Sequence, residues 1–146
     1  MARRFSTGLR NGLLGGATDG SFKDLMALGF LDLYSGSQPS SADDGETGTL
    51  LVGITVASGA TGLSFGDAAD GVIAKASEVW SGEIDNTGSA GWFRFYDANH
   101  TTGASTTAIR FDGSVGTSGA QLNLSSLSLV AGATLTIDTF TVSLAE

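Results

Sequence analysis

The stretch Glu78–Asp97, which reads EVWSGEIDNTGSAGWFRFYD, carries both tryptophans of the chain and decides the fold class. Apolar and polar side chains alternate on either side of a centre rich in Asp, Asn and Gly, which tolerate the backbone angles of a chain reversal. Alternation with a period of two residues is typical of a β-strand. The stretch therefore predicts two antiparallel strands joined by a short loop, with Trp80 and Ile84 on one face of the first strand.

The second of these strands is apolar on both of its faces. Phe93 and Phe95 point to one side, whereas the alternate positions Trp92, Arg94 and Tyr96 point to the other. One face is expected to be core, and the other either lies under a loop or meets a partner. Trp, Tyr and Arg dominate protein interfaces, so we expect the second set to anchor a protein contact. A platform that stacks a sugar against the aromatic rings is the alternative.

The rest of the chain predicts further short strands. Its 146 residues correspond to one domain, and its 22 glycines, with many Ser and Thr, disfavour long helices. A short helix is expected over Ser21–Gly29, where Ser21 can cap the first turn. The hydrophobic pattern of the last strand slips by one residue at Asp138–Thr139, which indicates a bulge or bend where a strand leaves one sheet for the other. We therefore predict an all-β, two-sheet, jelly-roll-like β-sandwich, with an immunoglobulin-like sandwich as the second choice.

Residues 1–20, which read MARRFSTGLRNGLLGGATDG, differ in character from the remainder. Their glycines predict an extended N-terminal arm, so that the domain proper covers residues 21–146. The arm carries arginines and apolar residues that would otherwise be exposed. We expect Arg3, Arg4, Phe5 and Arg10 to dock on a partner.

The distribution of charge argues against several classes of partner. The formal net charge is −8, and the chain beyond Thr18 contains only four basic residues but 15 acidic ones. Direct binding of nucleic acid is therefore disfavoured, because phosphate contacts need a basic surface. No apolar run is long enough to predict a membrane span, and the absence of Cys excludes disulfides and thiolate metal sites.

Residues that would carry catalysis or bind a metal are sparse. His100 is the only histidine and lies in a polar loop, so a surface imidazole is expected rather than a catalytic base. The acids Asp43, Asp44 and Glu46 lack the spacing of an EF-hand, which favours a solvated loop over a calcium site. We expect no enzymatic activity, no cofactor and no metal. A hydrolase that uses Glu78, Glu83 and Asp97 is the minor alternative.

Several segments resemble one family of known proteins. Residues 20–55 read GSFKDLMALGFLDLYSGSQPSSADDGETGTLLVGIT, and the later segments GWFRFYDAN and AIRFDGSVGTSGAQLNL follow the same resemblance. Together they are similar to small structural proteins that tailed bacteriophages encode among their virion genes. The shared motifs are structural, so the resemblance implies a fold and a setting.

The resemblance implies a capsid cement, or decoration, protein on the exterior of the virion. Such a protein binds the seams between major capsid proteins and stabilises the shell, and it is expected to self-associate as a dimer or a higher symmetric cluster. The alternative is a tail or fibre component with a glycan-binding β-sandwich.

Overall fold

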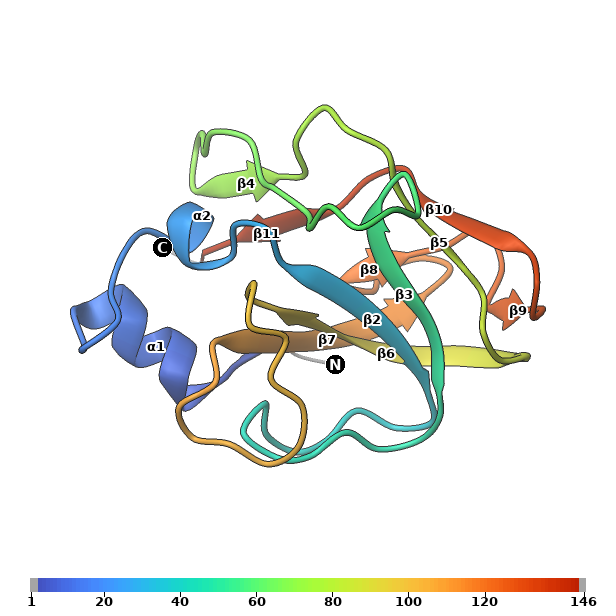
Figure 1. The fold of residues 1–146 in the computed structure, drawn as a ribbon, viewed down its shortest axis with the longest axis horizontal. Coiled ribbons are helices and arrows are strands. Elements are labelled where there is room, and N and C mark those ends of the chain that lie inside the picture. The colour runs from blue at the N-terminus through green and yellow to red at the C-terminus, as the bar shows by residue number, and fades with distance from the viewer. Residues whose placement is uncertain (1–2, 145–146) are drawn as a thin grey trace.

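The computed structural model describes residues 3–144 as two β-sheets with two short helices at the N-terminal side (Figure 1). The N-terminal half contains β1 (Arg4–Phe5), α1 (Thr7–Leu14), α2 (Phe22–Leu25), β2 (Phe30–Ser35), β3 (Leu50–Val56) and β4 (Val72–Ala74). The C-terminal half contains β5 (Trp80–Glu83), β6 (Gly88–Tyr96), β7 (Arg110–Gly116), β8 (Leu122–Asn123), β9 (Ser128–Leu129), β10 (Thr134–Ile137) and β11 (Thr141–Ser143).

The strands form one large and one small sheet. The large sheet has the order β1-β7-β6-β2-β3-β5-β10, with β8 attached to β7 and β9 attached to β6. The small sheet consists of β11 and β4. All pairs are antiparallel except β7 and β8. The predicted all-β sandwich with a short N-terminal helix is confirmed. No helix in the described part of the chain is both long and apolar enough to cross a membrane.

The predicted hairpin between the two tryptophan-bearing strands is wrong. Both strands exist as β5 and β6, but β2 and β3 lie between them in the sheet. The reason is a close approach of β5 to β3, where a Cβ atom on Gly82 would lie 2.1 Å from the carbonyl oxygen of Gly53. The absence of a side chain at residue 82 allows this contact, and Trp80 enters the core beside β3 with no exposed surface.

The predicted bend near Asp138–Thr139 is confirmed. Before it, β10 pairs with β5 in the large sheet, and after it, β11 pairs with β4 in the small sheet. Because the chain changes sheet here, side chains of both parities reach the core. Ile137 and Phe140 are both buried, although they lie an odd number of residues apart.

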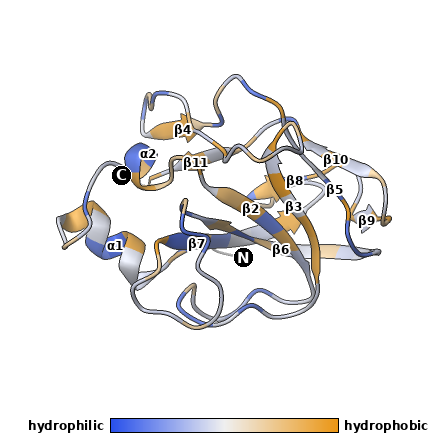
Figure 2. Ribbon diagram, in the orientation of Figure 1, coloured by the Kyte–Doolittle hydropathy of each residue, from blue (hydrophilic) through white to orange (hydrophobic). Residues whose placement is uncertain are grey.

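The core is an aromatic cluster between the two sheets. Phe95 and Phe111, from the adjacent strands β6 and β7, stack with ring centroids 5.4 Å apart. Phe65, Trp80 and Phe140 pack their rings around Phe95. Stacked and tilted aromatic pairs add to the stabilisation from burial itself. Figure 2 shows hydrophobic residues along β2 and β3, whereas β7 carries hydrophilic residues within the sheet.

The N-terminal segment is not an extended arm, so this prediction is wrong for residues 3–20. Arg4 and Phe5 pair with β7, and α1 follows directly, with the Ser6 hydroxyl accepting a hydrogen bond from the Leu9 amide at 3.1 Å. Leu9 is fully buried in the common core. The segment folds back because its apolar side chains find a surface on the same chain. Residues 1–2 of the expected arm, and residues 145–146 of the expected domain, lie outside the described residues.

The short helix α2 agrees with its predicted start. The Ser21 hydroxyl accepts a hydrogen bond from the Asp24 amide at 3.1 Å, which satisfies a donor of the first turn. The helix ends at Leu25, with Met26 as its C-cap, and is thus shorter than the predicted Ser21–Gly29.

Candidate functional site

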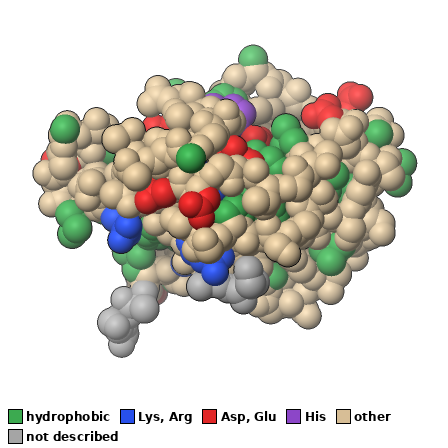
Figure 3. Space-filling view, turned by 90° about the horizontal axis from the view of Figure 1, so that it is seen from below, with side chains coloured by type: hydrophobic (Ala, Val, Ile, Leu, Met, Phe, Trp, Pro, Cys, Tyr) green, Lys and Arg blue, Asp and Glu red, His purple; other side chains and the backbone are tan. Residues whose placement is uncertain are grey.

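Two long loops cover the side of the large sheet that faces away from the aromatic core. Loop 36–49 follows β2 and loop 97–109 follows β6, and both lie at the bottom of Figure 1. We call the sheet surface beneath them the loop-covered face. It carries Asp32, Tyr34, Trp92, Arg94, Tyr96, Arg110 and Asp112, all of which are buried. Seen from below in Figure 3, the molecule presents mainly polar side chains and backbone, with acidic side chains among them.

Arg94 is the centre of the loop-covered face. Its Nε and Nη2 atoms donate to the two carboxylate oxygens of Asp112 at 2.5 and 2.9 Å. Its Nη1 donates to Glu46 Oε1 at 3.0 Å and to the Asp44 carbonyl at 2.9 Å. Burial alone would lower the pKa of Arg94, but the bonds and charge of Asp112 outweigh this and raise the pKa above its ordinary value. The side chain is therefore a permanent cation that joins two strands to loop 36–49.

Arg110 joins the two loops to each other. Its Nε donates to the Ala42 carbonyl at 2.8 Å, while Nη1 and Nη2 donate to the Thr101 and Gly103 carbonyls at 2.8 and 2.7 Å. Ala42 belongs to loop 36–49, and the other two acceptors belong to loop 97–109. The planar guanidinium presents five N–H donors, so one buried side chain can satisfy several loop carbonyls at once.

Glu46 reaches down from its loop to the tyrosines of the sheet. The Tyr96 hydroxyl donates to Glu46 Oε1 at 2.7 Å, and the Tyr34 hydroxyl lies 2.8 Å from that of Tyr96. The other carboxylate oxygen of Glu46 accepts from the Gly103 amide at 2.8 Å. Burial alone would raise the pKa of Glu46, but these hydrogen bonds and the charge of Arg94 outweigh it and hold the pKa below its ordinary value.

His100 is more integrated into the fold than the surface imidazole that the sequence predicted. Its Nε2 lies 2.8 Å from Asp32 Oδ2, and its ring stacks on Phe30 with centroids 4.7 Å apart. The ring also packs edge-on against Tyr96. The hydrogen bond to the Asp32 carboxylate raises the pKa of His100 in spite of partial burial. His100 therefore fastens loop 97–109 to β2.

Trp92, Arg94 and Tyr96 do not lie on an outer surface, which corrects their predicted role as anchors for a partner. All three are fully buried, and the Trp92 ring contacts both the Tyr34 ring and the Arg94 guanidinium. The physical reason is that a buried arginine needs acceptors, and the two loops bring them. The same burial removes the sugar-stacking platform that the sequence suggested as the alternative.

The four predicted contact residues of the N-terminal segment have different environments. Arg3 donates to the Ser143 carbonyl of β11 at 2.7 Å, and Arg4 donates to the Pro39 carbonyl at 3.0 Å. Phe5 packs against both Phe22 and Phe111. Arg10 is exposed, and its docking on a partner stays a prediction.

The acids of loop 36–49 form hydrogen bonds within the protein. Asp43 accepts from the amide and the hydroxyl of Thr7 at 2.8 and 2.6 Å, which attaches the start of α1 to the loop. Asp44 accepts from Ser40 and Ser41. Within residues 3–144, no group of three or more His, Asp or Glu side chains is placed to hold a metal ion.

The network beneath the loops contains residues that the sequence analysis did not single out. Arg110 and Asp112 alternate along β7, and Arg94 pairs with Asp112 across the sheet. The sequence did show charged side chains at two alternate positions of β7, on either side of Phe111, but only the strand register brings Arg94 and Asp112 together.

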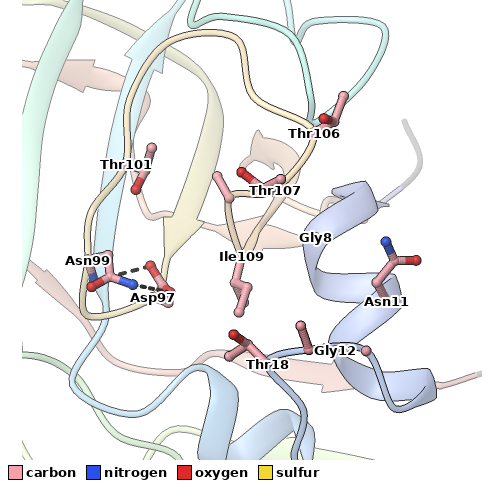
Figure 4. Close-up of a pocket in the computed structure, with 13 residues that line it drawn as sticks. Gly8, Asn11, Gly12, Thr18, Asp97, Asn99, Thr101, Thr106, Thr107 and Ile109 are labelled. Atoms are coloured by element: carbon pink, nitrogen blue, oxygen red, sulfur yellow. Dashed lines mark hydrogen bonds between the residues drawn. The ribbon is translucent and has the colours of Figure 1, made fainter.

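A pocket of about 370 Å³, with both polar and apolar walls, lies beside this network, between α1 and loop 97–109 (Figure 4). We call it the α1 pocket. Its helical wall is formed by Gly8 and Gly12, and Asp97 and Asn99 stand on the opposite side. Asp97 is 7% exposed, and burial raises the pKa of its carboxyl group although Asn99 donates hydrogen bonds to it.

The three carboxylates of the hydrolase alternative are not gathered in one cleft. Glu78 accepts from the Ser64 amide and from the Trp80 indole, both at 2.8 Å. Glu83 is exposed at the end of β5, and Asp97 follows the end of β6. In the sheet, β5 lies three strands away from β6 and runs antiparallel to it, so the two residues lie at opposite ends of the sheet. Three strand spacings correspond to about 14 Å. This exceeds the separation of about 5–10 Å that paired glycosidase carboxylates need.

A second hollow, of about 310 Å³, lies between α2, β4 and β11 and is almost entirely apolar. We call it the β4–β11 groove. Its lining includes Phe22, Ile73 and Val142, together with Val72 and Leu144, which are 39% and 61% exposed. Lys23 at its edge pairs with the exposed Asp67 at 2.6 Å.

No protein-family model, no curated protein and no solved structure matches this chain.

Proposed function

We propose that this chain is a capsid cement protein of a tailed bacteriophage, which binds the seams between major capsid proteins on the outside of the virion and stabilises the shell. The resemblance of residues 20–55, GWFRFYDAN and AIRFDGSVGTSGAQLNL to small virion proteins supports this setting. A sandwich whose loops are cross-linked by buried arginines also suits a protein that must resist mechanical load. The proposed activity is binding, without turnover of a substrate.

The β4–β11 groove is the observation that carries the proposal. Exposed apolar patches on proteins mark sites of interaction, because burying them on a partner removes apolar surface from water. Val72 and Leu144 provide such surface, and Arg3 lies on the backbone of β11 beside them. An apolar segment of the major capsid protein that carries an acidic residue would complement both the groove and Arg3. This groove replaces the strand face of Trp92 as the proposed contact surface.

Reconstitution on shells tests this proposal. Empty capsids of the parent virus that lack the protein are mixed with wild type, Val72→Asp or Leu144→Asp, and co-sedimentation is measured. A charge in the groove is expected to abolish binding, because an unpaired carboxylate is costly to bury. Val130→Asp is the matched control, since Val130 is 59% exposed and does not line the groove.

The stabilising role is tested on the same shells. Capsids with bound wild-type protein are expected to open at a higher temperature than bare capsids, and capsids mixed with the groove variants are expected to behave as bare ones. Groove variants that fold normally and still bind like wild type would contradict the proposal. Self-association as a symmetric cluster belongs to the same proposal and is measured by light scattering of the free protein.

A further inference from the structure

We propose that the α1 pocket is a binding site for an alkylammonium or guanidinium group, with Asp97 as its counter-ion. The proposal concerns the free protein and does not depend on a role in a capsid. It starts from a cavity of about 370 Å³, within the range of small-ligand sites.

The carboxylate of Asp97 is buried, and no Lys or Arg side chain of residues 3–144 forms a salt bridge with it. Its two oxygens accept hydrogen bonds of 3.1 and 3.2 Å from the backbone and side chain of Asn99, and the neighbouring His100, which pairs with Asp32, also stabilises the charge. The other buried acids in residues 3–144 differ, because Asp112 pairs with Arg94 and Asp32 pairs with His100. A buried charge is normally paired, so a site that opens onto an unpaired carboxylate favours a cation.

The remaining walls suit the other parts of such a ligand. Thr18, Thr101 and Thr107 are among the residues that line the pocket, and a threonine hydroxyl group can accept a hydrogen bond from an ammonium or guanidinium group. Ile109 stands in the middle of the pocket wall in Figure 4 and offers apolar surface to an alkyl chain. The glycines of α1 let the helix lie close to the loop, since a Cβ atom on Gly8 would lie 2.4 Å from the carbonyl oxygens of Thr107 and Ala108.

The electrostatic environment of Asp97 also favours binding of a cation. Burial raises the pKa of its carboxyl group, with hydrogen bonds from Asn99 and the nearby His100 acting in the opposite direction. The free protein therefore gives up stability when this group ionises, and an incoming cation would recover it. The other charged groups near the loop that carries Asp97 are Asp32 and Glu46, both of which face His100, and Arg110, which donates to the loop carbonyls of Thr101 and Gly103.

The experiment is an NMR titration of the full chain with n-butylammonium and methylguanidinium, and with 1-butanol as the neutral counterpart. Both cations are expected to shift the amide signals of Gly8, Gly12 and Thr107 saturably and to lower the pKa of Asp97. Butanol is expected to leave them unchanged. Equal binding of butanol would overturn the proposal, because the site would then recognise shape or hydroxyl groups instead of charge.

Variants identify the residue that recognises the cation. Asp97→Asn keeps the size of the side chain and should weaken binding of the cations about tenfold or more, since it removes the counter-ion. Asp85→Asn removes an exposed acid outside the pocket and should bind as wild type does. Unchanged binding by Asp97→Asn, or equal loss in Asp85→Asn, would overturn the proposal.

Two further measurements keep the result interpretable. Ala17 is exposed and lines the pocket, so Ala17→Phe should block the site without disturbing the core, and normal binding by this variant contradicts the location.

A peptide with one lysine and free putrescine are then compared. Tighter binding of the peptide assigns the site to a side chain of a partner protein, and tighter binding of putrescine assigns it to a free amine. Either ranking supports the cation site.

Discussion

Strand β6 buries two faces of different chemistry, and each is covered by a different kind of structure. Phe93 and Phe95 enter an aromatic core closed by other strands, where shape and apolar area supply the stability. On the other face, Arg94 is covered by loops that must provide oxygen acceptors at fixed positions. Apolar residues can pack against many surfaces, whereas a buried cation needs particular partners. The loop-covered face is therefore the more specific of the two, and each prediction below perturbs one face.

The largest expected effect is on the loop-covered face. Arg94→Met leaves the Asp112 carboxylate buried without its partner, so we expect a loss of about 3–5 kcal/mol in the free energy of unfolding. Urea denaturation followed by tryptophan fluorescence measures it. The double variant Arg94→Met, Asp112→Leu should recover most of the loss, because the fully buried Asp112 charge is removed as well and Glu46 keeps Arg110 at 3.8 Å. A double variant as unstable as the single one would show that the arginine stabilises by packing alone.

The aromatic face should respond through cavity formation. Leu33→Ala removes a fully buried side chain from β2 and is expected to cost about 2–5 kcal/mol. Hydrogen exchange separates this effect from the previous one. Loss of Arg94 should expose the Gly103 amide, which donates to Glu46, by local opening of the loops, whereas Leu33→Ala should lower protection throughout. The same exchange pattern in both variants would contradict the distinction between the faces.

A smaller effect is expected for the tyrosine pair. Tyr96 donates to Glu46, so the Tyr34 hydroxyl is the donor in the 2.8 Å bond between the two tyrosines. Tyr34→Phe removes this bond and should cost about 0.5–1.5 kcal/mol. The ring remains stacked on Trp92, so the near-ultraviolet circular dichroism should change little. A cost above that of Leu33→Ala would mean that the hydroxyl network, and not the arginine, holds the loops.

The smallest effect is a dependence of stability on pH through His100. Because the Asp32 carboxylate raises the pKa of His100 above its ordinary value of 6.5, the protonated form is favoured in the folded state. Its contribution to stability is fully present below pH 6.5 and is lost as the pH rises through the raised pKa. The difference in melting temperature between wild type and His100→Gln should therefore be larger in the acidic range. A difference that grows with pH would show that the neutral imidazole makes the stabilising contact.

Local patterns predicted local structure correctly. Alternating hydrophobicity marked the strands around Trp80 and Trp92, because the faces of a strand follow from its own sequence. The Ser21 cap and the bend near Asp138 were also readable, since each depends on a few neighbouring residues. Which strands pair with each other could not be predicted in this way. The close contact between Gly82 and Gly53, which separates β5 from β6, joins residues that are distant in the chain.

The candidate sites were less predictable for the same reason. Arg94 was identified as important, but its orientation toward a covering loop depends on Glu46, almost fifty residues earlier. Asp97 was considered only as a member of a catalytic set, and its position in the α1 pocket required α1 to form from a segment that predicted an extended arm. The glycines of that segment indicated flexibility, whereas the burial of Leu9 outweighed it.

The sequence by itself determined an all-β chain, the faces of its main strands, the acidic charge and the bend that sends its last strand to a second sheet. Each of these follows from side-chain chemistry over a few neighbouring residues. Only the tertiary structure decided which strands pair, that Arg4 and Phe5 join β7, and that two loops close over Arg94 and Arg110. Those outcomes depend on contacts between residues that are distant in the chain. A charge is buried at acceptable cost only if all of its hydrogen-bond acceptors are in place in the folded protein.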